Sequence, residues 1–291
     1  MKLLRSCALL LLGATFVTPA AAEPALRVGV TLHPYYSWVA NVVEGTGITV
    51  VPVIDGDVDI DAYQPRAEDI ARIASLDVLI VNGLGHDAVV DGMVRAAKKP
   101  GLLVVNVNRE TPTLPEAQGQ GANSHTFLSL TNAVAQSALI ARELGARVEP
   151  AVAVRLQENA ARYAKRLRAM LAATKQRLAP LAKPRVVTVH DGYGYLLQEL
   201  GVGLAGVVEP AHGLLPSAGE LQRIVELVKR EHVVVVLAEA SFPQALQRPL
   251  VDVGARVSTI SHVATGAFAA DTFERGMQMN LDTLVKALGA P

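Results

Sequence analysis

Cysteine is almost absent from this sequence. The single one, Cys7, lies in an N-terminal segment that we expect to be removed, so the mature chain should hold neither disulfides nor thiolate metal ligands. Aromatic residues are also few, at 4% of the chain, although apolar residues make up 51%. A core of this composition must be built from Val, Leu, Ile and Ala, and a ligand pocket in it has little aromatic surface for stacking.

Neither sign of charge is in excess. The chain has 27 basic and 27 acidic residues, a formal net charge of +0 at pH 7. A basic footprint for nucleic acid is therefore missing. After the N-terminal segment, no apolar run approaches the ~20 uncharged residues of a membrane-spanning helix. We expect a protein that binds no nucleic acid and is not embedded in a membrane.

The first 22 residues are typical of a secretory signal peptide. Lys2 and Arg5 precede an apolar run over residues 8–17, and small residues follow at 20–22. This order of basic, apolar and small residues predicts cleavage near Ala22 and export to the periplasm.

Short runs rich in β-branched residues alternate with helical patterns along the rest of the chain. Two sets of four strands are predicted: Arg27–Leu32, Ile48–Val53, Val78–Asn82 and Leu102–Val107, then Arg185–Val189, Leu204–Val208, Val233–Leu237 and Val257–Ile260. Strands that alternate with helices indicate right-handed βαβ units and parallel sheets. The fold class is therefore α/β, with two lobes that each contain a parallel sheet of about four strands flanked by helices.

One long helical pattern separates the two sets of strands. Apolar residues recur at steps of three or four from Val152 to Leu178, and prolines stand near both ends, at Pro150 and Pro180. We expect a single amphipathic helix that joins the lobes. The predicted boundaries are 1–22 for the signal peptide, 23–148 for the N-terminal lobe, 149–181 for the linking helix and 182–291 for the C-terminal lobe.

Six of the seven histidines are predicted to lie at one edge of the two sheets. Loops at the carboxyl ends of parallel strands converge on a crevice where ligands bind. The polar residues that follow strands are His33, Asp59, Asp61, His86, Asp87 and His125 in the first lobe, and His190, Glu209, His212, Glu239 and His262 in the second. His232 precedes its strand, at the opposite end, and is expected to be structural or solvated.

Imidazoles and carboxylates that converge from two lobes indicate a metal site. Three imidazoles with one carboxylate, and no thiolate, suit tetrahedral Zn²⁺, whereas Mn²⁺ prefers more oxygen ligands. His33, His86 and His212 are expected at the rim, and Glu239 either binds the ion or orients an imidazole. Two alternatives stay open. Asp61 lies in an acidic stretch where aspartate commonly shapes a turn, and Ser261, beside His262, is an alternative ligand to that histidine.

Several motifs through most of the mature chain resemble one family. They are Tyr63-Gln64-Pro65, Asn82-Gly83-Leu84-Gly85, Asn123-Ser124-His125, His190-Asp191-Gly192-Tyr193-Gly194-Tyr195, Glu209-Pro210, Pro216-Ser217-Ala218 and Asn280-Leu281. With them the chain resembles the metal-binding receptors of bacterial zinc and manganese ABC importers, the group built with a rigid linking helix. The resemblance implies two α/β lobes joined by one helix, with a metal bound between them by four side chains.

The resemblance also implies a set of ligands. His125 and His190 match two histidine ligands of the family. The family's first ligand is usually a histidine in an Asp-Pro-His-x-Tyr run, where this chain has Asp61, and its last is usually an aspartate, where this chain has Ser261-His262. The predicted metal ligands are therefore Asp61, His125, His190 and His262, which keep three imidazoles and one carboxylate by exchanging two positions.

The function implied is capture of a divalent metal, zinc first and Mn²⁺ as the alternative, by a monomeric receptor that delivers it to an ABC permease subunit. An accessory periplasmic metal chaperone, or a helix-linked receptor for an organic or chelated-metal ligand, stays open. An enzyme is not expected, because the chain has no His-Glu-x-x-His run and no Gly-x-Ser-x-Gly elbow.

Overall fold

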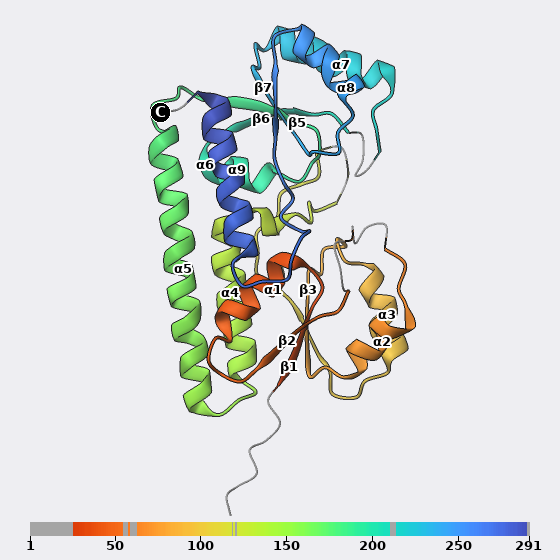
Figure 1. Ribbon diagram of the computed structural model, residues 1–291, viewed down its shortest axis with the longest axis vertical. Coiled ribbons are helices and arrows are strands. Elements are labelled where there is room, and N and C mark those ends of the chain that lie inside the picture. Colours follow the sequence, from red (N-terminus) through yellow and green to blue (C-terminus); the bar gives the residue numbers. More distant parts are fainter. Residues whose placement is uncertain are drawn as a thin grey trace, which may run out of the picture.

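Two α/β lobes are stacked along the long axis of the molecule (Figure 1). The computed structural model describes residues 26–54, 58, 63–117, 119, 121–209 and 214–289. The helix α5 (Pro150–Leu178) runs alongside both lobes, and α4 (Leu130–Gly145) and α9 (Thr272–Leu288) pack against it. No helix within the described ranges is both long and apolar enough to cross a membrane.

The first lobe contains a four-stranded parallel sheet. Its strands are β1 (Arg27–Val30), β2 (Thr49–Pro52), β3 (Val78–Val81) and β4 (Leu103–Asn106), in the order β2-β1-β3-β4. Its helices are α1 (His33–Val42), α2 (Ala67–Ala74) and α3 (Val89–Ala97). Valine dominates these strands because β-branched side chains pack well on a pleated sheet that is covered on both faces.

The second lobe repeats this plan. Its strands are β5 (Arg185–Thr188), β6 (Gly203–Val207), β7 (Val235–Ala238) and β8 (Arg256–Thr259), also parallel and in the order β6-β5-β7-β8. Its helices are α6 (Gly194–Leu200), α7 (Ala218–Arg230) and α8 (Gln244–Asp252). In both sheets the first strand pairs with the second and the third, so the carboxyl ends of all four strands share one edge.

Helix α5 forms because apolar residues recur on one side of it. Pro150 stands in its first turn, where the missing N–H has no helical partner to lose. Its 29 residues span about 44 Å at 1.5 Å per residue. The buried residues of α5 are Leu156, Asn159, Ala160, Tyr163, Ala164, Leu167, Thr174 and Leu178. The basic residues of its polar side lie outside the buried set.

Most of the buried apolar residues form one continuous core. It runs from both faces of the first sheet through α1, α4, α5 and α9 to strands β5 and β7 of the second lobe. A second, smaller cluster lies beneath α7 and α8 and includes Val187, Val236 and Leu250. The two lobes therefore share a hydrophobic core on the side of the linking helix.

The predicted fold class is confirmed. The eight predicted strands are all present, with ends that differ by at most two residues, and the predicted linking helix is α5. Helix α9 begins against α1 of the first lobe, although its chain arrives from β8 of the second.

Candidate metal site

Two of the predicted ligands, His125 and His190, meet between the lobes. His125 ends the long loop after β4, directly before the short 3-10 turn Thr126–Leu128, and His190 follows β5. Their Nε2 atoms are 2.9 Å apart and their ring centroids 4.6 Å apart. Both are buried, with 8% and 3% of the residue exposed. One imidazole from each lobe therefore contacts the other between the lobes.

The Nδ1 atoms of the two rings face oxygen acceptors. His125 Nδ1 is 3.1 Å from Asn123 Oδ1, and His190 Nδ1 is 3.3 Å from Glu209 Oε2. The orientation of the Asn123 amide is fixed, because Oδ1 accepts the His125 backbone N–H while Nδ2 donates to the Asp191 carbonyl. Each neutral ring therefore has its proton on Nδ1 and a lone pair on Nε2.

Two lone pairs that face each other at 2.9 Å repel unless a cation lies between them. Two imidazoles bound to one tetrahedral zinc ion at 2.0 to 2.1 Å have nitrogens about 3.3 Å apart. The pair is close to that spacing, so a small opening of the rings would admit a metal ion. A proton shared between the two nitrogens is the other cation that fits.

Gly192 makes this approach of the two rings possible. A Cβ at this position would lie 2.8 Å from His190 Cδ2 and 3.2 Å from His125 Cδ2. Contacts this short force something to shift, so any side chain at this position would press on both imidazoles.

The loop that carries His125 is attached to the second lobe. Tyr195 donates its hydroxyl to the Asn123 carbonyl at 2.7 Å and accepts the Leu114 N–H at 2.9 Å. Asp191 Oδ2 accepts the Ala117 N–H at 2.6 Å. The position of His125 is therefore set by residues that neighbour His190 in the sequence.

His262, which follows β8, extends this group. Its ring centroid is 4.6 Å from that of His190 and 6.1 Å from that of His125. Its Nε2 is 3.0 Å from Glu239 Oε1, and Glu239 also accepts the Tyr193 hydroxyl. The group therefore contains three imidazoles from loops that follow β4, β5 and β8.

Two protonation states follow from the surroundings of Glu239. Burial raises the pKa of Glu239, but contacts with His262 and Tyr193 outweigh burial and hold the pKa below its usual range. Burial, with the Glu239 carboxylate beside it, raises the pKa of Tyr193 well above its usual value. Glu239 is an anion at neutral pH, and Tyr193 keeps the proton that it donates.

His86 is a fourth imidazole at this place. Its ring centroid is 4.8 Å from that of His125, and the residue is 8% exposed. The next residue, Asp87, accepts bonds from the Thr31 hydroxyl at 2.6 Å and the Asn82 N–H at 2.7 Å, which fixes the loop after β3. Burial raises the pKa of Asp87, and these hydrogen bonds only partly oppose that rise.

The other candidates lie elsewhere or outside the described residues. His33 stacks on Phe268 of the segment between β8 and α9, with ring centroids 4.0 Å apart. His232 is exposed in the turn before β7 and has a left-handed backbone, φ 53°. The predicted ligand Asp61, together with Asp59 and His212, lies outside the described residues.

Among the residues that the structure describes, no three His, Cys, Asp or Glu side chains already have the arrangement of a metal site. They provide adjoining pairs: His125 with His190, His190 with Glu209, and His262 with Glu239.

Sequence reasoning missed the roles of Asn123, Gly192 and Tyr193. All three stand in motifs that the sequence displays beside His125 and His190. The motifs mark the positions, but only the contacts say what each side chain does.

Known proteins resemble this chain over most of its length. A family model described as "ZnuA: Zinc-uptake complex component A periplasmic" matches residues 28–287. The chain is 24% identical over 262 residues to a "Putative metal-binding protein" of Treponema pallidum. The aligned region covers 85% of this chain and 82% of that protein.

Solved structures agree with the family match. The "SBP FpvC in complex with Ni2+ ion from P.aeruginosa" is 43% identical, with a TM-score of 0.82, covering 91% of this chain and 97% of that chain. A "Crystal structure of ZnuA" is 21% identical with a TM-score of 0.77, covering 91% and 99%, and shows that the fold is shared. This is a family of transport-associated binding proteins, not of enzymes. The chain belongs to the family of periplasmic metal-binding proteins that serve as substrate-binding components of ABC importers.

Proposed function

We propose that this protein captures a divalent transition-metal ion, zinc in the first instance, and delivers it as a monomer to the permease of an ABC importer. The observation that carries the proposal is the pair of Nε2 atoms of His125 and His190, which face each other at 2.9 Å while both Nδ1 atoms face oxygen acceptors. The N-terminal segment 1–22 would direct export and be removed near Ala22.

The proposed ligands are Asp61, His125, His190 and His262. Three imidazoles and one carboxylate make the donor set of a four-coordinate zinc site without thiolates. For His262 to bind through Nε2, its contact with Glu239 must open, and Glu239 then becomes a further carboxylate beside the ion. Metal binding would draw these side chains inward, and the resulting closed form is what the permease would recognise.

A second candidate cargo is a metal ion that takes six ligands. His86 and Glu239 adjoin the proposed ligands, so together with Asp61 the chain offers up to four imidazoles and two carboxylates. Six nitrogen and oxygen donors suit Mn²⁺ or Ni²⁺ better than they suit zinc. Structures of the relative FpvC, which is 43% identical, are described as complexes with Ni²⁺ and with Mn²⁺.

Native mass spectrometry of the chelator-stripped mature protein tests the proposal. Offered Zn²⁺, Mn²⁺ and Ni²⁺ together, the protein is expected to take up one ion, zinc by the first candidate and Mn²⁺ or Ni²⁺ by the second. His125→Ala should abolish uptake, and Asp61→Ala and His262→Ala should each weaken it. His232→Ala, which removes an exposed histidine before β7, at the opposite end of the strands from the site, is the control.

Metal uptake by His125→Ala equal to that of the parent protein would overturn the proposal. Uptake unchanged in both Asp61→Ala and His262→Ala would reject the exchanged ligand positions alone.

A further inference from the structure

The segment that carries His262 is held from within by a buried asparagine. Asn280 lies in α9 and is 2% exposed. Its Oδ1 accepts the Ser261 N–H at 2.9 Å, and its Nδ2 donates to the Ser261 carbonyl at 2.7 Å. One amide side chain thus fixes both backbone polar groups of the residue that precedes His262.

The residue after His262 is also constrained. Val263 has φ 54°, a left-handed conformation that is unfavourable for a β-branched residue. Its N–H donates to Ser261 Oγ at 3.1 Å, and the residue is buried. A Cβ at Gly276 of α9 would be 2.6 Å from Val263 Cγ1, so this glycine leaves the room that Val263 occupies. Helix α9 therefore contacts both neighbours of His262 in the sequence.

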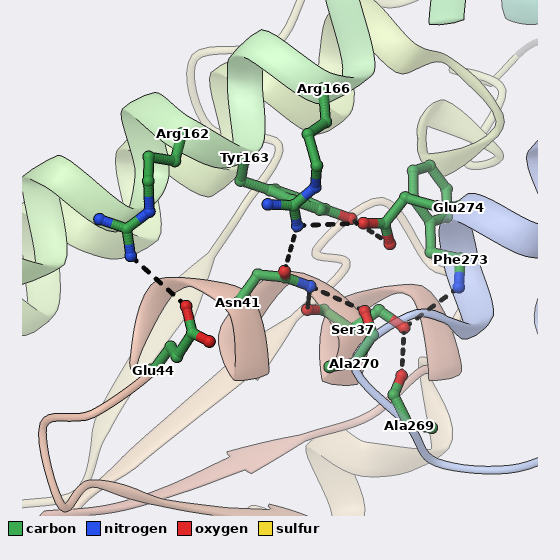
Figure 2. Close-up of polar contacts among 10 residues, drawn as sticks. All are labelled: Ser37, Asn41, Glu44, Arg162, Tyr163, Arg166, Ala269, Ala270, Phe273 and Glu274. Atoms are coloured by element: carbon green, nitrogen blue, oxygen red, sulfur yellow. Dashed lines mark hydrogen bonds and ion pairs between the residues drawn. The ribbon is translucent and has the colours of Figure 1, made fainter.

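The beginning of α9 is in turn fixed to α1 (Figure 2). Ser37 donates its hydroxyl to the Ala269 carbonyl at 2.7 Å and accepts the Phe273 N–H at 3.2 Å. Asn41 Nδ2 donates to the Ala270 carbonyl at 2.7 Å. These side chains of the first lobe hold the point where the chain enters α9.

The linking helix holds the same point from its other side (Figure 2). Tyr163 donates its hydroxyl to Glu274 Oε2 at 3.1 Å. Arg166 is paired with Glu274 Oε1 at 3.2 Å and also donates to Asn41 Oδ1. The first turn of α9 is therefore anchored to both α1 and α5.

We propose that α9 is the element that positions His262 in the metal site, and that Asn280 is the positioning residue through which it does so. The inference rests on the proposed function. This role accounts for two features of the segment. The buried amide of Asn280 makes both of its hydrogen bonds to Ser261, and Val263, directly after His262, is held in a strained conformation. A loop without these contacts would allow the His262 imidazole many positions. Fixing the ring in one of them would cost entropy and make metal binding weaker.

Zinc affinity of the full mature chain, measured by competition with a chromophoric chelator, tests the inference. Asn280→Ala is expected to weaken Zn²⁺ binding at least about tenfold, which is the loss of affinity typical when a residue that supports a metal ligand is removed. In a His262→Ala background the same substitution should have no further effect, because the imidazole that it positions is gone. The visible spectrum of the Co²⁺ form should shift in the same direction in Asn280→Ala and in His262→Ala.

Asn159→Ala is the matched control. Asn159 is also a buried helical asparagine, 2% exposed, whose Nδ2 donates to backbone carbonyls, those of Val42 and Glu44. It lies outside the metal site, so its loss should reduce stability and leave zinc affinity unchanged.

Gly276→Ala keeps the inference testable if Asn280→Ala does not fold. Alanine favours the helix, and its methyl group must displace Val263 and hence His262. The expected result is again weaker zinc binding that disappears in the His262→Ala background.

The outcomes separate this inference from the proposed function. If His262→Ala weakens binding while Asn280→Ala and Gly276→Ala do not, the positioning role is wrong and the receptor function stands. A loss in Asn280→Ala that persists without His262 also rejects the positioning role. If the parent protein binds no metal, or His262→Ala binds as tightly as the parent, the inference fails together with the site on which it rests.

Discussion

At the scale of single residues, the protonation of the histidines decides what the site can hold. Asn123 and Glu209 face Nδ1 of His125 and His190, so the remaining nitrogens face each other with lone pairs. The choice of tautomer is therefore made by neighbouring oxygens and not by the histidines themselves. This is why a pair of buried imidazoles, which could otherwise share a simple hydrogen bond, suits a cation.

The first residue-scale prediction concerns the space beside these rings. Gly192→Ala should weaken metal binding at least about tenfold, because its Cβ would come within 3.2 Å of both imidazoles and separate them. Zinc affinity by competition titration measures the effect. Gly219→Ala is the matched control, since a Cβ there meets nothing within 4 Å. Equal affinity in Gly192→Ala and the parent would show that the rings can move without cost.

At the scale of elements, the helices on the side of α5 act as supports and carry none of the proposed ligands. Helix α5 fixes α1 through Asn159, whose Nδ2 donates to the carbonyls of Val42 and Glu44 at 2.8 and 2.9 Å. These carbonyls stand at the end of α1, where no helical donor is available. A side chain of one helix therefore satisfies the end of another.

We predict that Asn159→Ala lowers the free energy of unfolding by about 1 to 3 kcal/mol, because it removes the side-chain donor of the buried Val42 carbonyl. Urea denaturation of the metal-free protein measures this. Glu158→Ala, on the exposed side of the same helix, should change stability by less than about 0.5 kcal/mol. A loss in Asn159→Ala no larger than in Glu158→Ala would contradict the supporting role.

At the scale of the whole molecule, the two lobes are joined by more than the linking helix. The larger core is continuous through α1, α4, α5 and α9. Polar contacts also cross between lobes, since Glu199 of α6 accepts from Ser129, Leu130 and Thr131 at the start of α4. We therefore expect metal capture to involve a small rocking of the lobes and not a wide hinge motion.

Zinc affinity should fall as the pH falls. Imidazole must be neutral to bind a metal, so protons compete with the ion once the pH drops through about 6.5. Binding is strongest above this pH and weakens progressively below it. Competition titrations at pH 7.5 and pH 5 measure the change, with circular dichroism as the control that the protein remains folded at pH 5. Equal affinity at the two pH values would exclude histidine as the main ligand.

The sequence by itself determined the two α/β lobes, the eight strands and the linking helix, because the spacing of apolar residues is a local property that the chain displays directly. It also placed His125, His190 and His262 at the carboxyl edge of the sheets, because each follows a strand and the strands were expected to be parallel. The motif residues beside them were visible, but their roles were not.

Only the tertiary structure decided which oxygen faces which imidazole nitrogen. Glu209 reaches His190 from the next strand, Glu239 meets His262 from another, and Asn280 holds the His262 segment from a helix 18 residues further along the chain. Such contacts depend on side-chain directions and on packing between distant elements. Neither periodicity nor spacing encodes them, so they appear only when the chain is folded.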